Sequence, residues 1–323
     1  MKNTILLLVL LSSFLFAKDE KMIVVAGPIA TISHPLIYMQ HNDALKDLGL
    51  KIEFKLWNNP DELRALILKK KVDFIALPTN VAANLYNKDV DLQLINVATW
   101  GILGLLSRDK DLKTIEDFKN KEIIVPFRAD MPDIVLQALI KKANLDIKKD
   151  FKIKYVATPI DAMQMLILRR ADNVLLAEPA TSIALRKTGS FPVKLIAPDI
   201  YRSVNLQDEW GRLFKVKSEI PQAGIAVVGK TKANKELIEK FLTEYEKAIT
   251  WYKNNKEEAT KMVIKTIPML EESGLVDSIE HVILKNITAQ NSKNDLEFFF
   301  EVLLENDKKI IGGKLPNSGF YYK

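Results

Sequence analysis

Cysteine is absent from all 323 residues of the chain. Its absence excludes disulfide bonds, thiolate metal sites, a cysteine nucleophile and a lipid-modified N-terminal cysteine. An exported protein without disulfides is compatible with a bacterial periplasm. The sequence also lacks a serine nucleophile elbow, a metal-ligand cluster and a glycine-rich phosphate loop. We therefore expect neither an enzyme nor a bound metal or cofactor.

Long basic runs and long internal apolar runs are also missing. Lysine and arginine outnumber aspartate and glutamate by 47 to 41, but the excess is spread along the chain. Such a distribution does not follow a nucleic acid backbone, so we expect no nucleic acid partner. No run after the N-terminus reaches the roughly 20 apolar residues of a membrane-spanning helix. The mature chain is therefore expected to be a soluble protein, and we predict a monomer.

The N-terminus has the pattern of an export signal. Lys2 provides a positive start, an apolar run extends from Ile5 to Phe16, and Ala17 precedes the charged stretch 18–21. These three features are typical of a secretory signal peptide, and the run is too short to cross a bilayer. We predict a signal peptide over 1–17, cleavage near Ala17 and export to the periplasm. A retained N-terminal anchor or a buried first helix is the alternative.

The body of the chain alternates between strand and helix patterns. Strands are predicted at 22–26, 51–57, 73–77, 92–106, 122–126, 152–156, 173–177, 194–197 and 224–228. Helices are predicted at 35–48, 60–71, 80–86, 112–119, 130–143, 160–169 and 179–187, with further helical segments around Trp251, Met262, Ile283 and Phe298. Such alternation indicates parallel sheets with crossover helices. Two successive runs of this kind indicate two α/β lobes.

Five segments carry a resemblance to a known family. They are DFIALPTN (Asp73–Asn80), LKTIEDFKNKEIIVP (Leu112–Pro126), AMQMLILRRADNVLLAEP (Ala162–Pro179), the helical region Asn234–Met262 and the tail Ile311–Lys323. In this order and spacing they resemble nitrate/sulfonate/taurine-type periplasmic binding proteins of ABC importers, including the NMT1/THI5-like branch. The resemblance covers nearly the whole mature chain.

The resemblance implies a type II periplasmic-binding fold, in which each lobe is a mostly parallel sheet flanked by helices. The first lobe would comprise 18–106, the second 107–206, and 207–323 would return to the first lobe and end in helices. A small solute would lie between the lobes, at the carboxyl ends of the strands. The partners would be the permease and ATPase subunits at the inner membrane.

Turns after the predicted strands supply the candidate ligand-binding residues of the first lobe. They are Gly27, Pro28, His34, Asn58, Thr79, Asn80 and Trp100. Gly27 allows close backbone approach, although it also suits an ordinary turn. His34 is a candidate hydrogen-bond donor, and Trp100 a candidate stacking surface alongside Trp57, Tyr38, Tyr86 and Phe127. Thr79 and Asn80 precede a helix, where one would cap it and the other face the solute.

The second lobe contributes Phe127, Arg128 and Glu178 as candidates. Asp130, which is expected to cap the next helix, would occupy the backbone donors that an anion needs. Glu178 would accept a hydrogen bond from a ligand amine or brace the hinge. The turn at Asp130 favours a planar, uncharged or weakly basic solute, while a sulfonate-like solute stays the alternative.

Two other functions remain open at this point. An enzyme of the pyrimidine- or menaquinone-precursor type would share the fold, although the predicted export signal argues against a cytoplasmic enzyme. A sensor that presents its ligand to a membrane receptor would have the same binding site, so the sequence does not separate it from a transport protein.

Overall fold

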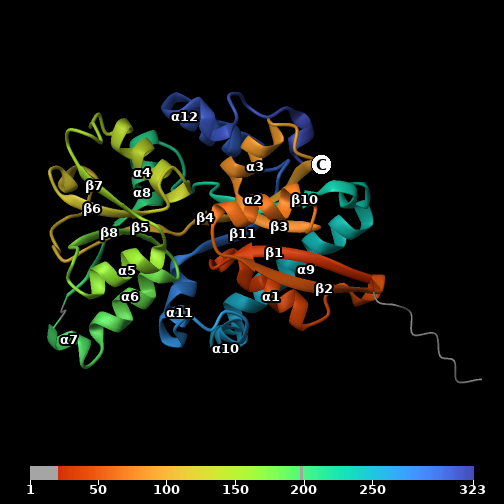
Figure 1. Ribbon diagram of the computed structural model, residues 1–323, viewed down its shortest axis with the longest axis horizontal. Coiled ribbons are helices and arrows are strands. Elements are labelled where there is room, and N and C mark those ends of the chain that lie inside the picture. Colours follow the sequence, from red (N-terminus) through yellow and green to blue (C-terminus); the bar gives the residue numbers. More distant parts are fainter. Residues whose placement is uncertain (1–20, 197–198) are drawn as a thin grey trace, which may run out of the picture.

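Two β-sheets with helices packed around them make up the computed structural model, which describes residues 21–196 and 199–323 (Figure 1). The predicted signal peptide lies outside the described residues. The strands are β1 (Lys21–Pro28), β2 (Leu50–Trp57), β3 (Phe74–Pro78), β4 (Leu92–Gly101), β5 (Leu103–Ser107), β6 (Glu122–Pro126), β7 (Lys152–Val156), β8 (Asn173–Ala177), β9 (Tyr201–Asn205), β10 (Ala223–Val228) and β11 (Ile283–Thr288).

The helices lie between and after these strands. They are α1 (His34–His41), α2 (Pro60–Leu68), α3 (Thr79–Tyr86), α4 (Met131–Lys142), α5 (Pro159–Ile167), α6 (Ala180–Gly189), α7 (Val193–Ile196), α8 (Leu206–Phe214), α9 (Lys235–Asn254), α10 (Lys256–Thr266), α11 (Glu272–Ser278) and α12 (Lys293–Asn306). None of the helices in the described parts of the chain is long and apolar enough to cross a membrane.

The predicted two-lobed α/β class is confirmed, but both sheets are mixed. The first sheet has the order β11-β4-β10-β3-β1-β2, and the second β7-β6-β8-β5-β9. Parallel pairs join β1 to β2 and β3, and β6 to β7 and β8. Antiparallel pairs join β10 and β11 to β4, β10 to β3, and β5 to β8 and β9.

The expectation of mostly parallel sheets is confirmed in strand direction, since β1, β2, β3 and β4 run one way in the first sheet and β6, β7, β8 and β9 run one way in the second. Strands β10, β11 and β5 run against them, and for β10 and β5 the reason is how the chain crosses between the lobes. Ala223 at the start of β10 is paired with Pro78 at the end of β3, and Leu103 at the start of β5 with Ala177 at the end of β8. A strand that enters a sheet at the edge where the others leave must run antiparallel to them.

Sheet pairing also bears on the predicted lobe boundaries. Strand β5 pairs with β8 and β9, although the predicted boundary assigned most of it to the first lobe. Helix α8 contacts α4, β5 and β9 of the second lobe. We propose that the chain first crosses at Ile102 and returns between α8 and β10.

Several predicted elements differ in type. Residues 193–196 form the short helix α7, where a strand was predicted at 194–197; Ala197 lies outside the described residues. The edge of the second sheet is instead occupied by β9. The segment after Ile283 is the strand β11, where a helix was predicted, because pairing with β4 outweighs local helical preference. The predicted helix at 112–119 is reduced to a 3-10 turn at Glu116–Phe118.

One apolar cluster runs through both lobes on the side of α12. It includes Trp100 and Leu105 at the crossing, Trp210 of α8, and Phe299 of α12, all buried. Trp210 lies edge-on to Phe299 with ring centroids 5.6 Å apart. The two lobes therefore share a packed core along this side.

Helix α11 joins the lobes on the opposite side (Figure 1). Its Leu275 is fully buried in a cluster with Ile37 of α1 and Val263 of α10. Its other face packs on α6 of the second lobe, where Gly274 lies so close to Ile183 that an added Cβ would come within 2.6 Å of its Cα atom. We call α11 and its contacts with α6 the clasp.

Candidate functional site

The facing edges of the two sheets meet at Ile102, the single residue between β4 and β5. The backbone there holds turns from both lobes. The Glu178 N–H donates to the Ile102 carbonyl over 2.9 Å, and the Gln222 N–H donates to the Thr99 carbonyl over 3.0 Å. The turns that follow β1, β3, β6 and β8 lie at the carboxyl ends of these strands, and we call the region between them the cleft.

Four buried polar side chains line up on the first lobe at this edge. Thr31 and His34 follow β1, Asn80 follows β3, and Gln222 precedes β10; all are at most 4% exposed. Within residues 21–196 and 199–323, no hydrogen-bond partner is found for Thr31 Oγ1, His34 Nε2, Asn80 Oδ1 or either amide atom of Gln222. Buried polar atoms are rarely left unpaired, so their convergence indicates a ligand or ordered water. We call these four residues the polar wall.

His34 is an uncharged member of the polar wall at neutral pH. Its ring is completely buried, and burial lowers its pKa to about 3. The Nδ1 atom lies 2.8 Å from the Tyr252 hydroxyl of α9. Burial, and after it the negative charge of Glu178, raises the Tyr252 pKa. Nε2 is therefore available to a ligand as one donor or one acceptor, according to the tautomer that Tyr252 selects.

Glu178 is the main charged group on the second lobe's side of the cleft. The side chain is 3% exposed. Its Oε1 pairs with the Arg202 guanidinium, and its Oε2 accepts the Ser182 N–H over 3.1 Å. Arg202 also donates to Ser182 Oγ over 2.6 Å. The protein itself thus engages this carboxylate at both oxygens, which favours the bracing role over a ligand contact.

The β6–α4 turn forms the other part of this side. Phe127 and Ala129 have positive φ angles of 55° and 61°. The buried carboxylate of Asp133 holds the turn by accepting the Ala129 N–H over 2.8 Å, while Asp130 accepts the Met131 N–H over 2.8 Å. Burial raises the pKa of the Asp130 carboxyl. Arg128 is exposed, with its guanidinium 5.3 Å from the centre of the Tyr155 ring.

A cavity of about 490 Å³ opens where the second sheet approaches the start of β11. Its lining includes Glu178, Thr181, Arg202, Ser203 and Val282. Thr181 and Ser203 are at most 7% exposed, and their hydroxyl oxygens have no hydrogen-bond partner in the described parts of the chain. The space between the lobes at the crossing is therefore lined by polar groups as well.

The structure brings three of the predicted residues to this region: His34, Asn80 and Glu178. Asn80 belongs to the polar wall and Thr79 does not, so a solute contact by Asn80 stays a prediction. The other expectation, a helix cap, is wrong, because neither side chain caps α3. The Thr79 hydroxyl instead donates to the Pro221 carbonyl over 2.6 Å.

Other predicted residues have structural contacts of their own. A Cβ on Gly27 would lie 2.3 Å from Ser33 Oγ, whose hydroxyl donates to the Pro28 carbonyl, so the close approach there is to the chain itself. Asn58 is exposed and its amide donates to Glu62. Trp100 lies in the core and its indole N–H donates to the Val97 carbonyl over 3.2 Å.

The aromatic side chains do not gather into one stacking surface. Trp57 is buried and donates to the Ala76 carbonyl. Tyr38 stacks on Trp251 with centroids 4.2 Å apart, and Tyr86 lies edge-on to Phe320. Each of these rings packs within its own neighbourhood. Phe127, in the β6–α4 turn, is the remaining aromatic candidate.

Sequence reasoning missed Thr31, Gln222, Tyr252, Thr181 and Arg202. Gln222 could have been found only by recognising that β10 enters its sheet at the cleft edge. His34 and Tyr252 are 218 positions apart, so no local pattern connects them. No group of three or more potential His, Asp or Glu metal ligands occurs among the described residues.

Comparisons with known proteins agree with this architecture. An ABC transporter protein from Parabacteroides distasonis has 21% identity and a TM-score of 0.76, covering 94% of this chain and 99% of that one. The aliphatic sulphonate-binding protein SsuA from Escherichia coli has 15% identity and a TM-score of 0.69, covering 94% and 92%. The nitrate-binding protein NrtA from Synechocystis PCC 6803 has 12% identity and a TM-score of 0.69, covering 90% and 82%.

At these identities the structural similarity establishes the fold, which is that of periplasmic binding proteins of ABC transporters. A search of curated proteins gave no match. The family described as NMT1/THI5 like matches residues 31–259, from the start of the polar wall into α10. This match spans well over half of the sequence, and the chain therefore belongs to the NMT1/THI5-like family.

Proposed function

We propose that the chain is the exported solute-binding subunit of an ABC importer, which captures a small solute between its lobes and delivers it to a permease and its ATPase. The observation that carries the proposal is the polar wall, where buried hydrogen-bonding atoms from three separate segments lack partners. A solute in the cleft would supply these partners. The fold and the family support the same function.

In this mechanism, binding and closure are one equilibrium. A solute that touches both the polar wall and the second lobe gains more contacts when the lobes are closed, so it shifts the population toward the closed state. Release to the permease requires the reverse motion. The shared core along α12 would act as the pivot, and the clasp at α6–α11 would separate on opening.

Catalysis is less well supported by the same groups. The candidate catalytic groups are the Tyr252 hydroxyl and the His34 imidazole, whose Nδ1 atom lies 2.8 Å from the hydroxyl oxygen. Because burial raises the Tyr252 pKa and lowers that of His34, this hydroxyl is a poor nucleophile and the imidazole a weak base. The pair is better suited to recognising a ligand.

A thermal-shift screen of the mature protein tests the proposal. The panel would contain pyrimidines, sulfonates, nitrate, riboflavin-like rings and metal ions. A solute that binds only the folded state stabilises it by RT ln(1 + [L]/Kd), about 2.7 kcal/mol at a hundredfold excess over Kd. We expect one class to raise Tm.

The double variant Asn80→Ala with Gln222→Ala should abolish the shift in Tm. The matched control, Asn58→Ala, should preserve the shift, because Asn58 is exposed and lies outside the polar wall. No shift with any class, together with turnover of a pyrimidine or menaquinone precursor, would contradict the proposal.

A further inference from the structure

Helix N-termini are the usual anion-binding feature at the edge of an α/β sheet, because their first N–H groups are free and the helix dipole is positive there. In the second lobe, α4 and α6 begin at the cleft edge, directly after β6 and β8. Whether these donors are free decides if the cleft can hold an oxyanion.

Carboxylates of the protein already accept one of the first N–H groups at each of these two helices. At α6, Glu178 accepts the Ser182 N–H over 3.1 Å. At α4, Asp130 accepts the Met131 N–H and Asp133 the Ala129 N–H, each over 2.8 Å. An incoming anion would have to displace these groups and would meet their negative charge.

The cations nearby do not restore a positive site. Arg202 is paired with Glu178 and bonded to Ser182 Oγ. Arg128 is exposed and lies over the Tyr155 ring. Arg64 of the first lobe pairs with Asp61 over 3.4 Å, and its charge partly offsets the effect of burial on the pKa of Asp130.

Apart from Arg64, which is paired with Asp61, the first lobe contributes the uncharged polar wall to this side. The polar wall consists of one hydroxyl, two amides and an imidazole that burial keeps uncharged. Together these groups provide donors and acceptors without net charge. A buried anion held by such groups would lack a compensating charge, and an uncompensated buried ion is strongly disfavoured.

We infer that the solute is an uncharged polar molecule with both hydrogen-bond donors and acceptors, such as a heterocyclic amide, and not an oxyanion. The inference rests on the proposed function and narrows it. It separates this chain from the structural neighbours that are named for sulfonate and nitrate binding.

Pairs of ligands that share a ring but differ in charge test the inference by calorimetry on the mature protein. Uracil is compared with orotate, and nicotinamide with nicotinate, alongside taurine and nitrate; the solute released from protein purified from the periplasm is identified by mass spectrometry. We expect heat only from uncharged members and a released solute that is neutral at pH 7. Tight binding of taurine, nitrate or a carboxylate member, or release of an anion, would overturn the inference and leave the proposed function standing.

Absence of any binding and of any released solute would instead contradict the proposed function on which the inference rests. A variant sharpens the comparison. Asp130→Asn removes one carboxylate from the cleft edge. It should raise affinity for the anionic members about tenfold, because a bound anion would then meet one negative charge fewer. Asp295→Asn, at an exposed carboxylate in the first turn of α12, is the matched control and should have no such effect. Equal responses to both changes would count against the inference.

Discussion

His34 combines complete burial with a hydrogen bond to Tyr252 on one ring nitrogen and no partner among the described residues on the other. Burying an imidazole is unfavourable mainly for its protonated form, so the folded protein holds this ring neutral. The consequence is a binding group whose hydrogen-bonding role does not change near neutral pH.

Stability should depend on pH through this residue. The pKa of His34 is about 3 in the folded protein and about 6.5 in an unfolded chain. Between these values only the unfolded chain takes up the proton, so the free energy of unfolding falls as pH drops below about 6.5. The slope is at most about 1.4 kcal/mol per pH unit.

Urea denaturation between pH 7 and pH 5 measures this slope. We expect His34→Gln to reduce it, since glutamine has no titrating group in that range. His41→Gln, at an exposed position on α1, serves as the control and should retain the wild-type slope. If His34→Gln and wild type had equal slopes, the buried neutral histidine would be excluded.

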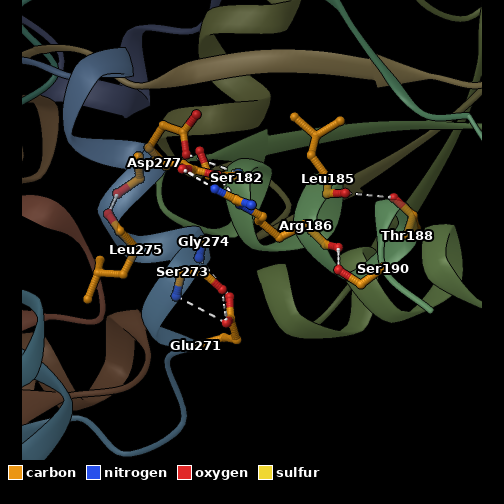
Figure 2. A network of polar contacts seen from close by, with 12 residues as sticks. Ser182, Leu185, Arg186, Thr188, Ser190, Glu271, Ser273, Gly274, Leu275 and Asp277 are labelled. Atoms are coloured by element: carbon orange, nitrogen blue, oxygen red, sulfur yellow. Dashed lines mark hydrogen bonds and ion pairs between the residues drawn. The ribbon is translucent and has the colours of Figure 1, made fainter. Parts of the chain in front are cut away.

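At the scale of elements, the clasp is the most specific contact between the lobes. Figure 2 shows Arg186 of α6 reaching Asp277 of α11, where its N–H groups donate to the two carboxylate oxygens over 2.5 and 2.9 Å. Glu271 fixes the start of α11 by accepting the Ser273 and Gly274 N–H groups. The ion pair is exposed and screened by solvent, so the close packing at Gly274 does more to hold the two helices together.

Gly274→Ala should therefore weaken the clasp. The new Cβ would meet the backbone of Ile183, and relieving that overlap costs about 1–3 kcal/mol. Since we propose that the lobes separate here on opening, a weaker clasp should lower solute affinity about tenfold or more. Calorimetry measures this change.

Gly189→Ala is the matched control. Gly189 is the last residue of α6, and an added Cβ there would meet nothing within 4 Å. Unchanged affinity in Gly274→Ala would mean that the α6–α11 contact does not couple to binding.

For the whole molecule, α12 and α11 lie on opposite sides of the connection between the lobes (Figure 1). We propose that the shared core beside α12 is the pivot and that the clasp at α11 is the part that opens. The apolar cluster around Trp210 and Phe299 is continuous between the lobes, and breaking it would expose large aromatic surfaces. Opening is therefore expected to rotate the lobes about this side while the clasp separates.

Small-angle X-ray scattering tests this motion. The radius of gyration of the wild-type protein should decrease when solute is added, since solute favours the closed state. Gly274→Ala without solute should have a larger radius than wild type without solute. Identical radii in all three samples would argue for a rigid molecule and against hinge closure.

Much of the order of helices and strands was predictable because it depends on local sequence patterns. The Asp130 cap was expected and is observed. The Asn59 cap of α2 and the left-handed Gly49 after the first helical region are equally local. These features depend on a few neighbouring residues. The strand β11 was not predictable in this way, because six residues starting at Ile283 become a strand only through pairing with β4.

The site was predictable only in part, for the same reason. His34 and Asn80 follow strands and could be proposed from the sequence, whereas Tyr252 and Gln222 are brought to the cleft by the packing of α9 and the antiparallel entry of β10. The sequence alone indicated the two-lobed class, the family resemblance and a helix cap at Asp130 that disfavours an anion there. Each of these depends on local patterns or on the order of motifs along the chain. Only the tertiary structure decided which polar atoms remain unpaired, because pairing depends on contacts between residues far apart in the chain.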